Sequence, residues 1–405
     1  MHTNVVTNPT KTEILQLLIQ LGLTSGGSFA IWRKPKSNTV EIVLDENAIP
    51  VKSELSIEAL EPGFIVHPFQ DQADKKAYFI KANKYFSFEL NKPVAPDDLP
   101  EWAKIQLSSQ EKLTAEEIRK LLLNQTLISK TPSTKLSEDK AHFTELVKKG
   151  IEAIQQNVME KVVPARTKTI SIPTNFNLSS TLLNLMESYP NAFINFFHLP
   201  NVGTWIGASP ETLIETNGDI FTTMSLAGTQ KATGDNPLKS VAWTQKEIEE
   251  QALVSRYIVS CFKKIRLREY EEHGPKTVVA GNLLHLRSDF RINMQETGFP
   301  ELGSIMLCLL HPTSAVCGMP RQEAHDFLQE HEGFDRSFFS GFLGPVNIQG
   351  STSIYVNLRT ASLQENKATL YAGAGVTEDS DPEKEWEETE LKCEIIGQFI
   401  QNPSA

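Results

Sequence analysis

The strongest constraint on the fold is a stretch near the C-terminus that reads as a helix with carboxylates on its apolar side. From Tyr371 the chain runs YAGAGVTEDSDPEKEWEETELKCEIIGQFI. Ser380, Pro382 and Glu383 match a capping box with proline in the first turn, so we expect the helix to begin at this point. At about 100° per residue, one stripe of this helix faces the core. Its members are Glu385, Glu388, Lys392, Ile395, Ile396 and Phe399.

A second stretch, TQKEIEEQALVSRYIVSC, repeats this pattern. Thr244 and Glu247 make another capping box, and the apolar stripe of the predicted helix again opens with two carboxylates, Glu247 and Glu250. A carboxylate on an apolar face is costly unless a cation, a salt bridge or a proton neutralises it. Two such helices could pool four carboxylates around Mg²⁺, which prefers oxygen ligands. The pattern leaves one alternative open, in which Glu247 only caps its helix and the other carboxylates reach water.

Composition and charge restrict the class of protein. The chain has 405 residues, of which 40% are hydrophobic and 22% are charged, values typical of a soluble globular protein. Its net charge of -11 and its lack of clustered Lys and Arg argue against a nucleic-acid surface. The four cysteines lack the spacing of a metal site or a disulfide framework, and no window resembles a signal peptide or a membrane span. We therefore expect a soluble, cytoplasmic protein without nucleic-acid or membrane partners.

Strand-like runs and helices alternate along the chain without an internal repeat. Residues 1–135 combine a helix over Glu13–Leu21 with runs such as SFAIWRK and TVEIVLD, and a polar seam, LISKTPSTKLSEDK, precedes a helix over 140–157. We therefore divide the chain into an N-terminal subdomain, 1–135, and a main region, 136–405, within one expected structural domain. Many short strands joined by hairpin-like turns favour an α+β fold with mostly antiparallel sheets covered by helices.

The glycine-rich segments do not make a nucleotide-binding motif. Neither GAS nor AGAG fits G-x-G-x-x-G or a P-loop, and a polar loop separates AGAG from the following helix, which excludes a Rossmann-type site. Gly373 and Gly375 could instead turn backbone N–H groups toward an anion close to the helix that carries Glu388.

An ordered set of motifs connects the chain to a known family. The set consists of EKVVPAR at Glu160, GASPE at Gly207, SLAGT at Ser225, KEIEEQ at Lys246, HPTSAVCGMP at His311, RSFFSGFLG at Arg336, YVNLR at Tyr355 and the YAGAG stretch at Tyr371. Together these motifs resemble the chorismate-utilising enzymes, relatives of anthranilate synthase component I and of salicylate synthases, and most closely the isochorismate synthases. The resemblance covers roughly Phe143 to Phe399 and is loose in the N-terminal third.

The resemblance implies a single large α+β domain, with two packed antiparallel sheets ringed by helices, and makes 136–405 the chorismate-binding catalytic region. It also implies a Mg²⁺-dependent site, in which the metal holds the ring carboxylate of chorismate. Glu250 and Glu388 match the family's Mg²⁺ ligands. Glu247 and Glu385 match supporting carboxylates that reach the metal directly or through water.

The same resemblance assigns the acid and the base of the reaction. Water must add at ring carbon C2 while the C4 hydroxyl departs, which requires a base and an acid on opposite sides of the ring. Lys161 matches the water-activating lysine, and Glu211 matches the acid, a role that requires a raised pKa for its carboxyl group. Further matches are substrate-binding residues: Gly228, Thr229, His285, Arg359, Gly373 and Lys392. From the pattern alone, Lys161 is equally an exposed strand lysine and His285 a packed core histidine.

Two departures and three alternatives accompany this assignment. Gln251 stands where many relatives have His, and Phe339 where many have Tyr, which bears on specificity more than on reaction class. A salicylate synthase would go on to eliminate pyruvate, but HPTSAVCG, with Ala315, is more similar to the isochorismate branch. Aminating relatives pair with a glutaminase, and a non-catalytic descendant would lack Lys161, Glu211 or a metal ligand. We therefore expect an isochorismate synthase for menaquinone or siderophore synthesis, working as a monomer or weak homodimer.

Overall fold

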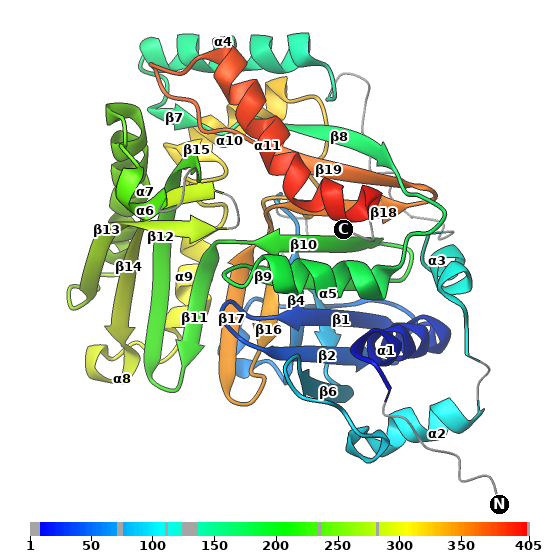
Figure 1. Ribbon diagram of the computed structural model, residues 1–405. Coiled ribbons are helices and arrows are strands. Elements are labelled where there is room, and N and C mark those ends of the chain that lie inside the picture. Colours follow the sequence, from blue (N-terminus) through cyan, green and yellow to red (C-terminus); the bar gives the residue numbers. More distant parts are fainter. Residues whose placement is uncertain are drawn as a thin grey trace, which may run out of the picture.

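Two large antiparallel sheets carry the fold of this computed structural model (Figure 1), which describes residues 9–70, 76–109, 112–123, 137–232, 237–280 and 283–402. The first sheet contains, in spatial order, β6 (Lys84–Glu89), β2 (Thr39–Asp45), β1 (Ser28–Arg33), β9 (Phe193–Leu199), β10 (Gly203–Ser209), β18 (Thr360–Gln364), β19 (Lys367–Gly373) and β8 (Ala165–Ser171). The second contains β13 (Glu271–Ala280), β14 (Leu283–Asn293), β12 (Ile220–Lys231), β11 (Thr212–Asn217), β17 (Ser351–Val356), β16 (Phe342–Val346), β4 (Gly63–His67), β5 (Ala77–Lys81) and β3 (Val51–Ser53). A short pair, β7 (Lys161–Val162) with β15 (Gly318–Met319), stands apart. The expected α+β class with two mostly antiparallel sheets is confirmed.

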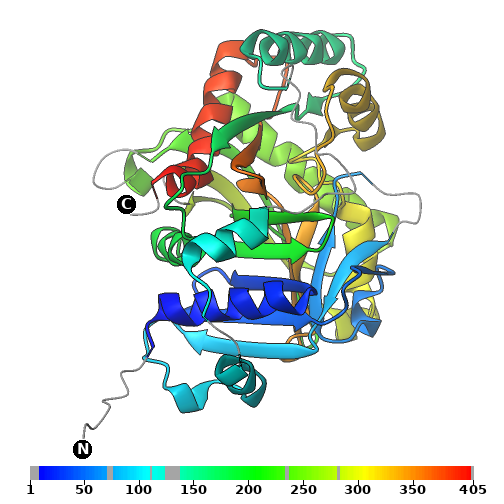
Figure 2. The same cartoon turned by 90° about the vertical axis from the view of Figure 1, so that its right-hand side faces the viewer.

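The first sheet is buried on both faces, which explains why its strands read as continuous apolar runs. Along β9, Phe193 and Phe197 enter one hydrophobic cluster, whereas Ile194 and Phe196 enter a second one on the opposite face. Helices cover this second face, as Figures 1 and 2 show. They are α1 (Lys11–Ser25), α5 (Leu178–Ser188) and α11 (Pro382–Gln401).

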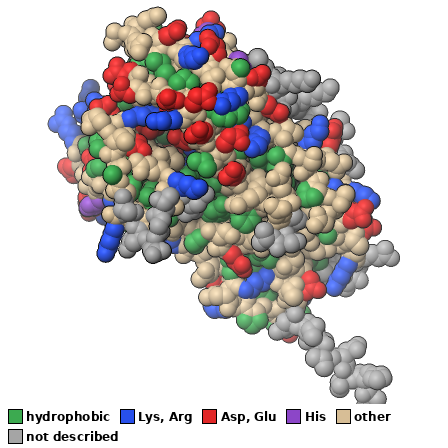
Figure 3. Space-filling model, turned by 45° about the horizontal axis from the view of Figure 1, so that its top comes forward, with side chains coloured by type: hydrophobic (Ala, Val, Ile, Leu, Met, Phe, Trp, Pro, Cys, Tyr) green, Lys and Arg blue, Asp and Glu red, His purple; other side chains and the backbone are tan. Residues whose placement is uncertain are grey.

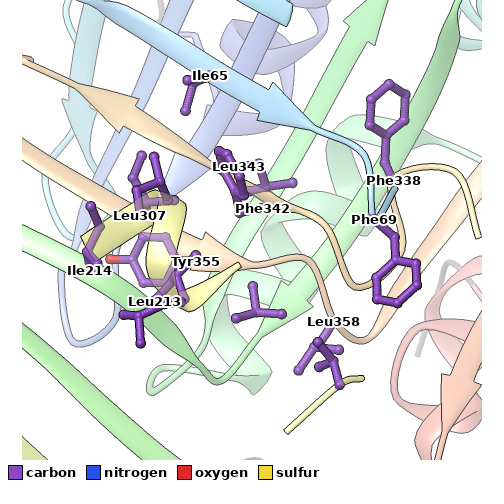
Figure 4. Close-up of a cluster of buried hydrophobic side chains, with 14 of the residues drawn as sticks. Ile65, Phe69, Leu213, Ile214, Leu307, Phe338, Phe342, Leu343, Tyr355 and Leu358 are labelled. Atoms are coloured by element: carbon purple, nitrogen blue, oxygen red, sulfur yellow. The ribbon is translucent and has the colours of Figure 1, made fainter. Parts of the chain in front are cut away.

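The other hydrophobic cluster contains residues of both sheets and of the helices behind the second sheet. Figure 4 shows part of it, where Ile65 of β4, Ile214 of β11, Leu343 of β16 and Leu307 of α9 (Leu302–Leu310) lie among the drawn side chains. The remaining helices are α2 (Glu101–Ser109), α3 (Ala115–Leu123), α4 (Lys140–Gln155), α6 (Pro237–Ser240), α7 (Gln245–Lys264), α8 (Met294–Thr297) and α10 (Arg321–His331), with 3-10 turns η1 (Ile57–Ala59) and η2 (Pro96–Asp98).

Residues 1–135 contribute strands to both sheets. Trp32 of β1 lies opposite Asn195 of β9, and Ile65 of β4 lies opposite Gly344 of β16. The expected boundary at 135, with most of the polar seam before it, falls outside the described residues. The helices expected over Glu13–Leu21 and 140–157 are present as α1 and α4.

Helix α11 begins one residue away from the expected cap. Asp381, not Ser380, is the N-cap, because its carboxylate accepts hydrogen bonds from the backbone N–H groups of Glu383 and Lys384 at 2.9 and 3.1 Å. The Ser380 hydroxyl accepts instead from the backbone N–H of Thr377 at 3.1 Å. Both residues are good helix caps, so the sequence pattern does not separate them. The capping box of α7 forms as expected, since the Glu247 carboxylate accepts from the backbone N–H of Thr244 at 2.6 Å.

The surface and the helices show two further features. On the face drawn in Figure 3, Lys and Arg side chains are interspersed with Asp and Glu. Within the described ranges, no helix is both long enough and apolar enough to pass through a lipid bilayer.

Candidate active site

One cavity, of about 650 Å³ of empty volume, collects residues from both sheets and from helices α7 and α11. Nine of the twelve residues predicted to bind substrate or metal or to act in catalysis line it: Glu211, Gly228, Thr229, Glu250, His285, Arg359, Gly373, Glu388 and Lys392. Apolar and aromatic side chains complete the wall, among them Val163, Leu226, Ala315, Val316 and Phe339. Lys161, Glu247 and Glu385 are not lining residues. An apolar cavity with a few convergent polar groups is the usual form of a small-molecule site.

Lys161 of β7 lies directly behind the cavity and is fully buried. Its Nζ donates a hydrogen bond to Oε1 of Glu250 at 2.8 Å, so the interpretation of Lys161 as an exposed strand lysine is wrong. Burial alone would raise the pKa of Glu250, but the adjacent Lys161 ammonium outweighs it and lowers this pKa. Gly375 packs against the pair, where a Cβ atom would come within 2.3 Å of Glu250 Oε1 and 3.2 Å of Lys161 Cε. A side chain at this position would therefore displace the Glu250 carboxylate.

A second lysine–carboxylate pair lies on α11. Lys392 Nζ donates to Glu388 Oε1 at 2.6 Å and to the backbone carbonyl of Gly373 at 2.7 Å. On the facing wall, the backbone N–H of Gly228, a residue with φ of 68°, points toward Glu250 Oε2 at 3.3 Å. Gly228 therefore meets Glu250 through its backbone N–H, whereas Gly373 meets Lys392 through its backbone carbonyl.

Glu247 and Glu385 are held by other partners. The Glu247 carboxylate accepts from Thr244 and also from Gln230 Nε2 at 2.8 Å, which is the capping role that the sequence left open. Glu385 is 1% exposed and forms an ion pair with Lys246. Burial, followed by the neighbouring Glu388 carboxylate, raises the pKa of Glu385. The expected pool of four carboxylates is thus reduced to two at the cavity, with Glu385 beside them.

These donors nevertheless suit Mg²⁺. Across the described part of the chain, no three His, Cys, Asp or Glu side chains gather closely enough to hold a metal by themselves. Mg²⁺ does not require that many, because it keeps several waters and is bound through one or two carboxylates together with substrate oxygens. Glu250 and Glu388 provide two carboxylates at one cavity, and each already sits against a positive charge. The residues present therefore fit a hydrated divalent cation.

Among the carboxyl groups that line the cavity, Glu211 is the one whose pKa is raised. It follows β10 and is 4% exposed. Burial raises the pKa of Glu211 to about 7, against the opposing effect of Arg359, Lys161 and Lys392. The carboxyl group therefore holds a proton near neutral pH, as a general acid must.

This raised pKa predicts a pH-dependent cost to stability. The folded protein keeps a proton on Glu211 up to about pH 7, whereas an ordinary glutamate loses it near 4.5. Between these values the folded state binds more protons, so the contribution of Glu211 to the free energy of unfolding falls as the pH rises. Glu211→Gln should remove this loss. We expect its unfolding free energy relative to wild type to be higher at pH 8 than at pH 5 by roughly 2 to 3 kcal/mol, measured by urea titration.

The matched control for that comparison is Glu383→Gln, because Glu383 is exposed and pairs with Lys140 far from the cavity. Its difference from wild type should stay constant between the two pH values. An equally constant difference for Glu211→Gln would show that Glu211 is ionised throughout this range.

Arg359 gives the cavity a positive charge, and His285 gives it a hydrogen-bond acceptor. Arg359 has a φ of 48° and lies between β17 and β18. No carboxylate in the described ranges lies within 4.0 Å of its guanidinium, so its charge is available to a ligand. His285 Nδ1 donates to the backbone carbonyl of Gly228 at 2.8 Å, and burial, followed by Arg359, lowers the pKa of His285 to about 3. The ring is therefore neutral, and its buried Nε2, which has no described protein partner, is an acceptor.

Two basic residues at or near the site were not predicted from the sequence. Lys246 forms an ion pair with Glu385, and Arg336 lines the cavity and forms a buried ion pair with Glu332. Both lie inside motifs that the sequence analysis quoted, yet no pattern in one sequence shows which buried partner a Lys or Arg will meet. Gln251 is turned away from the cavity and donates to the Ser225 hydroxyl at 2.8 Å. Phe339 is part of the wall and stacks on Tyr371, with ring centroids 5.5 Å apart.

The sequence of the chain is similar to those of known proteins. Residues 75–401 match the chorismate binding enzyme family. Isochorismate synthase EntC of Escherichia coli K12 is 30% identical over 263 residues, which is 63% of this chain and 66% of that protein. The vibriobactin-specific isochorismate synthase of Vibrio cholerae is 29% identical over 244 residues, which is 59% and 61% of the two chains. Both matches thus span less than two thirds of the relative's length.

The fold has a close counterpart among solved structures. The structure described as a putative 2,3-dihydroxybenzoate-specific isochorismate synthase, DhbC, from Bacillus anthracis superposes with a TM-score of 0.70. The superposition covers 94% of this chain and 98% of that one, at 23% sequence identity. At this identity the likeness concerns the fold, and it includes the N-terminal third that the motifs covered only loosely.

Proposed function

Because this chain belongs to the family of chorismate binding enzymes, we propose that it is an isochorismate synthase, which converts chorismate to isochorismate with Mg²⁺. The observation that carries the proposal is the cavity itself, in which a carboxyl group with a pKa of about 7, Glu211, faces the Glu250 and Glu388 carboxylates and the cationic Arg359. The names of the relatives support the same activity. The working unit is proposed to be a monomer or weak homodimer in the cytoplasm.

The substrate is a dianion, and the cavity offers a separate partner for each carboxylate. Arg359 and Lys392 supply positive charge, and Gly228 and Gly373 line the same cavity. Mg²⁺ held by Glu250 and Glu388, with Glu385 beside them, would neutralise the ring carboxylate and fix its position. Thr229 and the Nε2 acceptor of neutral His285 are then available to the ring hydroxyl groups.

The reaction balances as an exchange of water for a hydroxyl group. The oxygen of a water molecule bonds to C2 while its proton passes to the amine of Lys161, and both ring double bonds shift by one position. The C4–O bond breaks, and Glu211 gives its proton to the leaving oxygen, which departs as water. Binding of Mg²⁺ to Glu250 and Glu388 would also release Lys161 from its ion pair with Glu250.

Product analysis tests this proposal and separates it from salicylate synthesis. The purified protein is incubated with chorismate and Mg²⁺ at neutral pH, the products are separated by chromatography, and pyruvate is followed with coupled lactate dehydrogenase. We expect isochorismate with little salicylate, because Phe339 places an apolar ring in the cavity wall where many relatives have a polar Tyr, which removes one contact that could turn the enolpyruvyl chain over C2. Stoichiometric pyruvate without a second enzyme would instead identify a salicylate synthase.

A further inference from the structure

Helix α11 presents two adjoining stripes, and only one of them faces the cavity. The first stripe bears Glu388 and Lys392, which line the cavity. The second stripe bears Trp386, Thr389 and Glu390 at the i, i+3 and i+4 spacing of one helix face. Since the two stripes are parts of one rigid helix, whatever fixes the second stripe also fixes where the Glu388 carboxylate points.

A single side chain, Arg166 of β8, contacts all three residues of the second stripe. Its Nε donates to the Thr389 hydroxyl at 2.6 Å, its Nη2 forms an ion pair with Glu390, and its Cζ lies 3.8 Å above the ring of Trp386. The guanidinium is 2% exposed, so these contacts are shielded from solvent. A planar group that stacks on one residue and donates to two others specifies the rotation of the helix as well as its distance.

The strand that carries Arg166 also leads to the other half of the site. Lys161, the partner of Glu250 on α7, lies five positions earlier in the same EKVVPAR segment. Arg166 itself pairs with Ala372 of β19, beside Gly373, whose carbonyl accepts from Lys392. Figure 1 shows β8 and β19 running side by side next to α11. The segment thus connects the carboxylate of α7 with the carboxylate of α11.

We propose that Arg166 is a positioning residue for the metal site, which sets the rotation of α11 so that Glu388 meets Glu250 across the cavity. This inference rests on the proposed function, because it assumes that the two carboxylates bind a divalent cation. Arg166 touches neither substrate nor metal. Its loss should therefore weaken metal binding while the fold is retained.

The test measures binding of Mn²⁺, as a spectroscopic substitute for Mg²⁺, by electron paramagnetic resonance in the absence of chorismate. Arg166→Ala should weaken binding by about 10- to 100-fold, the usual effect of removing a partner that orients a metal ligand. Arg166→Lys keeps the charge, but a lysine cannot stack on Trp386 and donate to two residues at once. We therefore expect its Mn²⁺ affinity to fall by at least about 10-fold. Added methylguanidinium should recover part of the affinity of Arg166→Ala.

The matched control is Lys168→Ala. Lys168 also pairs with Glu390, at 2.6 Å, but its side chain is 37% exposed. The Mn²⁺ affinity of Lys168→Ala should therefore stay within about 2-fold of wild type. Wild-type affinity in a folded Arg166→Ala variant would overturn the inference, and so would unfolding of both Arg166 variants, since Arg166 would then serve the fold alone. Wild-type protein that neither binds Mn²⁺ nor consumes chorismate would overturn the proposed function instead.

Discussion

Glu388→Gln should abolish turnover of chorismate while leaving the protein folded. The Glu388 side chain lines the cavity and is 25% exposed, so an amide of the same size is tolerated. The amide cannot supply the negative charge that Mg²⁺ requires, and a bound metal lowers a reaction barrier by several kcal/mol. We expect a decrease in kcat/KM of at least about 100-fold. The measurement is the initial rate of isochorismate formation over a range of Mg²⁺ concentrations, with circular dichroism to verify the fold.

Glu383→Gln on the same helix is the control, because Glu383 points to solvent and pairs with Lys140. Its rate should equal that of wild type. The metal assignment fails if Glu388→Gln keeps wild-type activity after treatment with a chelator.

The Lys161→Ala variant should still bind chorismate but should no longer convert it. The substitution removes the amine next to Glu250 that is proposed to accept a proton from the attacking water. General bases contribute on the order of 10²- to 10⁴-fold to a rate, so a decrease in kcat of this size is expected, with little change in chorismate affinity. Binding is measured by quenching of tryptophan fluorescence and turnover by chromatography.

Lys168→Ala serves as the control lysine, since Lys168 lies on the neighbouring strand β8 and is partly exposed. It should behave as wild type in both measurements. Near-normal turnover of Lys161→Ala would remove Lys161 from the chemistry and leave it a structural partner of Glu250.

The local features of α7 and α11 were predictable because helix periodicity determines which residues share a face. The inward direction of Glu385, Glu388 and Lys392 follows from that rule, and the structure agrees. Helix periodicity does not predict which groups the Glu247 carboxylate contacts. In the first turn of a helix, one carboxylate can reach back to the cap or inward to the core, and tertiary contacts with Gln230 decide the outcome.

Long-range pairing explains what the sequence did not reveal. The placement of β1 between β2 and β9, and of β4 beside β16, joins strands far apart in the chain, and no local pattern encodes such a partner. The division at 135 therefore gave no hint that the N-terminal third enters both sheets. Arg166 is a similar case, since its partners on α11 lie more than two hundred positions away.

The most direct test of the proposed reaction is to run it in water labelled with oxygen-18. Water adds at C2 and the C4 hydroxyl group leaves, so each molecule of isochorismate should carry one labelled oxygen, on C2, while unreacted chorismate collected early in the reaction stays unlabelled. Mass spectrometry of the separated products detects both species. Unlabelled isochorismate would contradict the roles of Lys161 and Glu211, and a failure to convert chorismate in the presence of Mg²⁺ would contradict the proposed function as a whole.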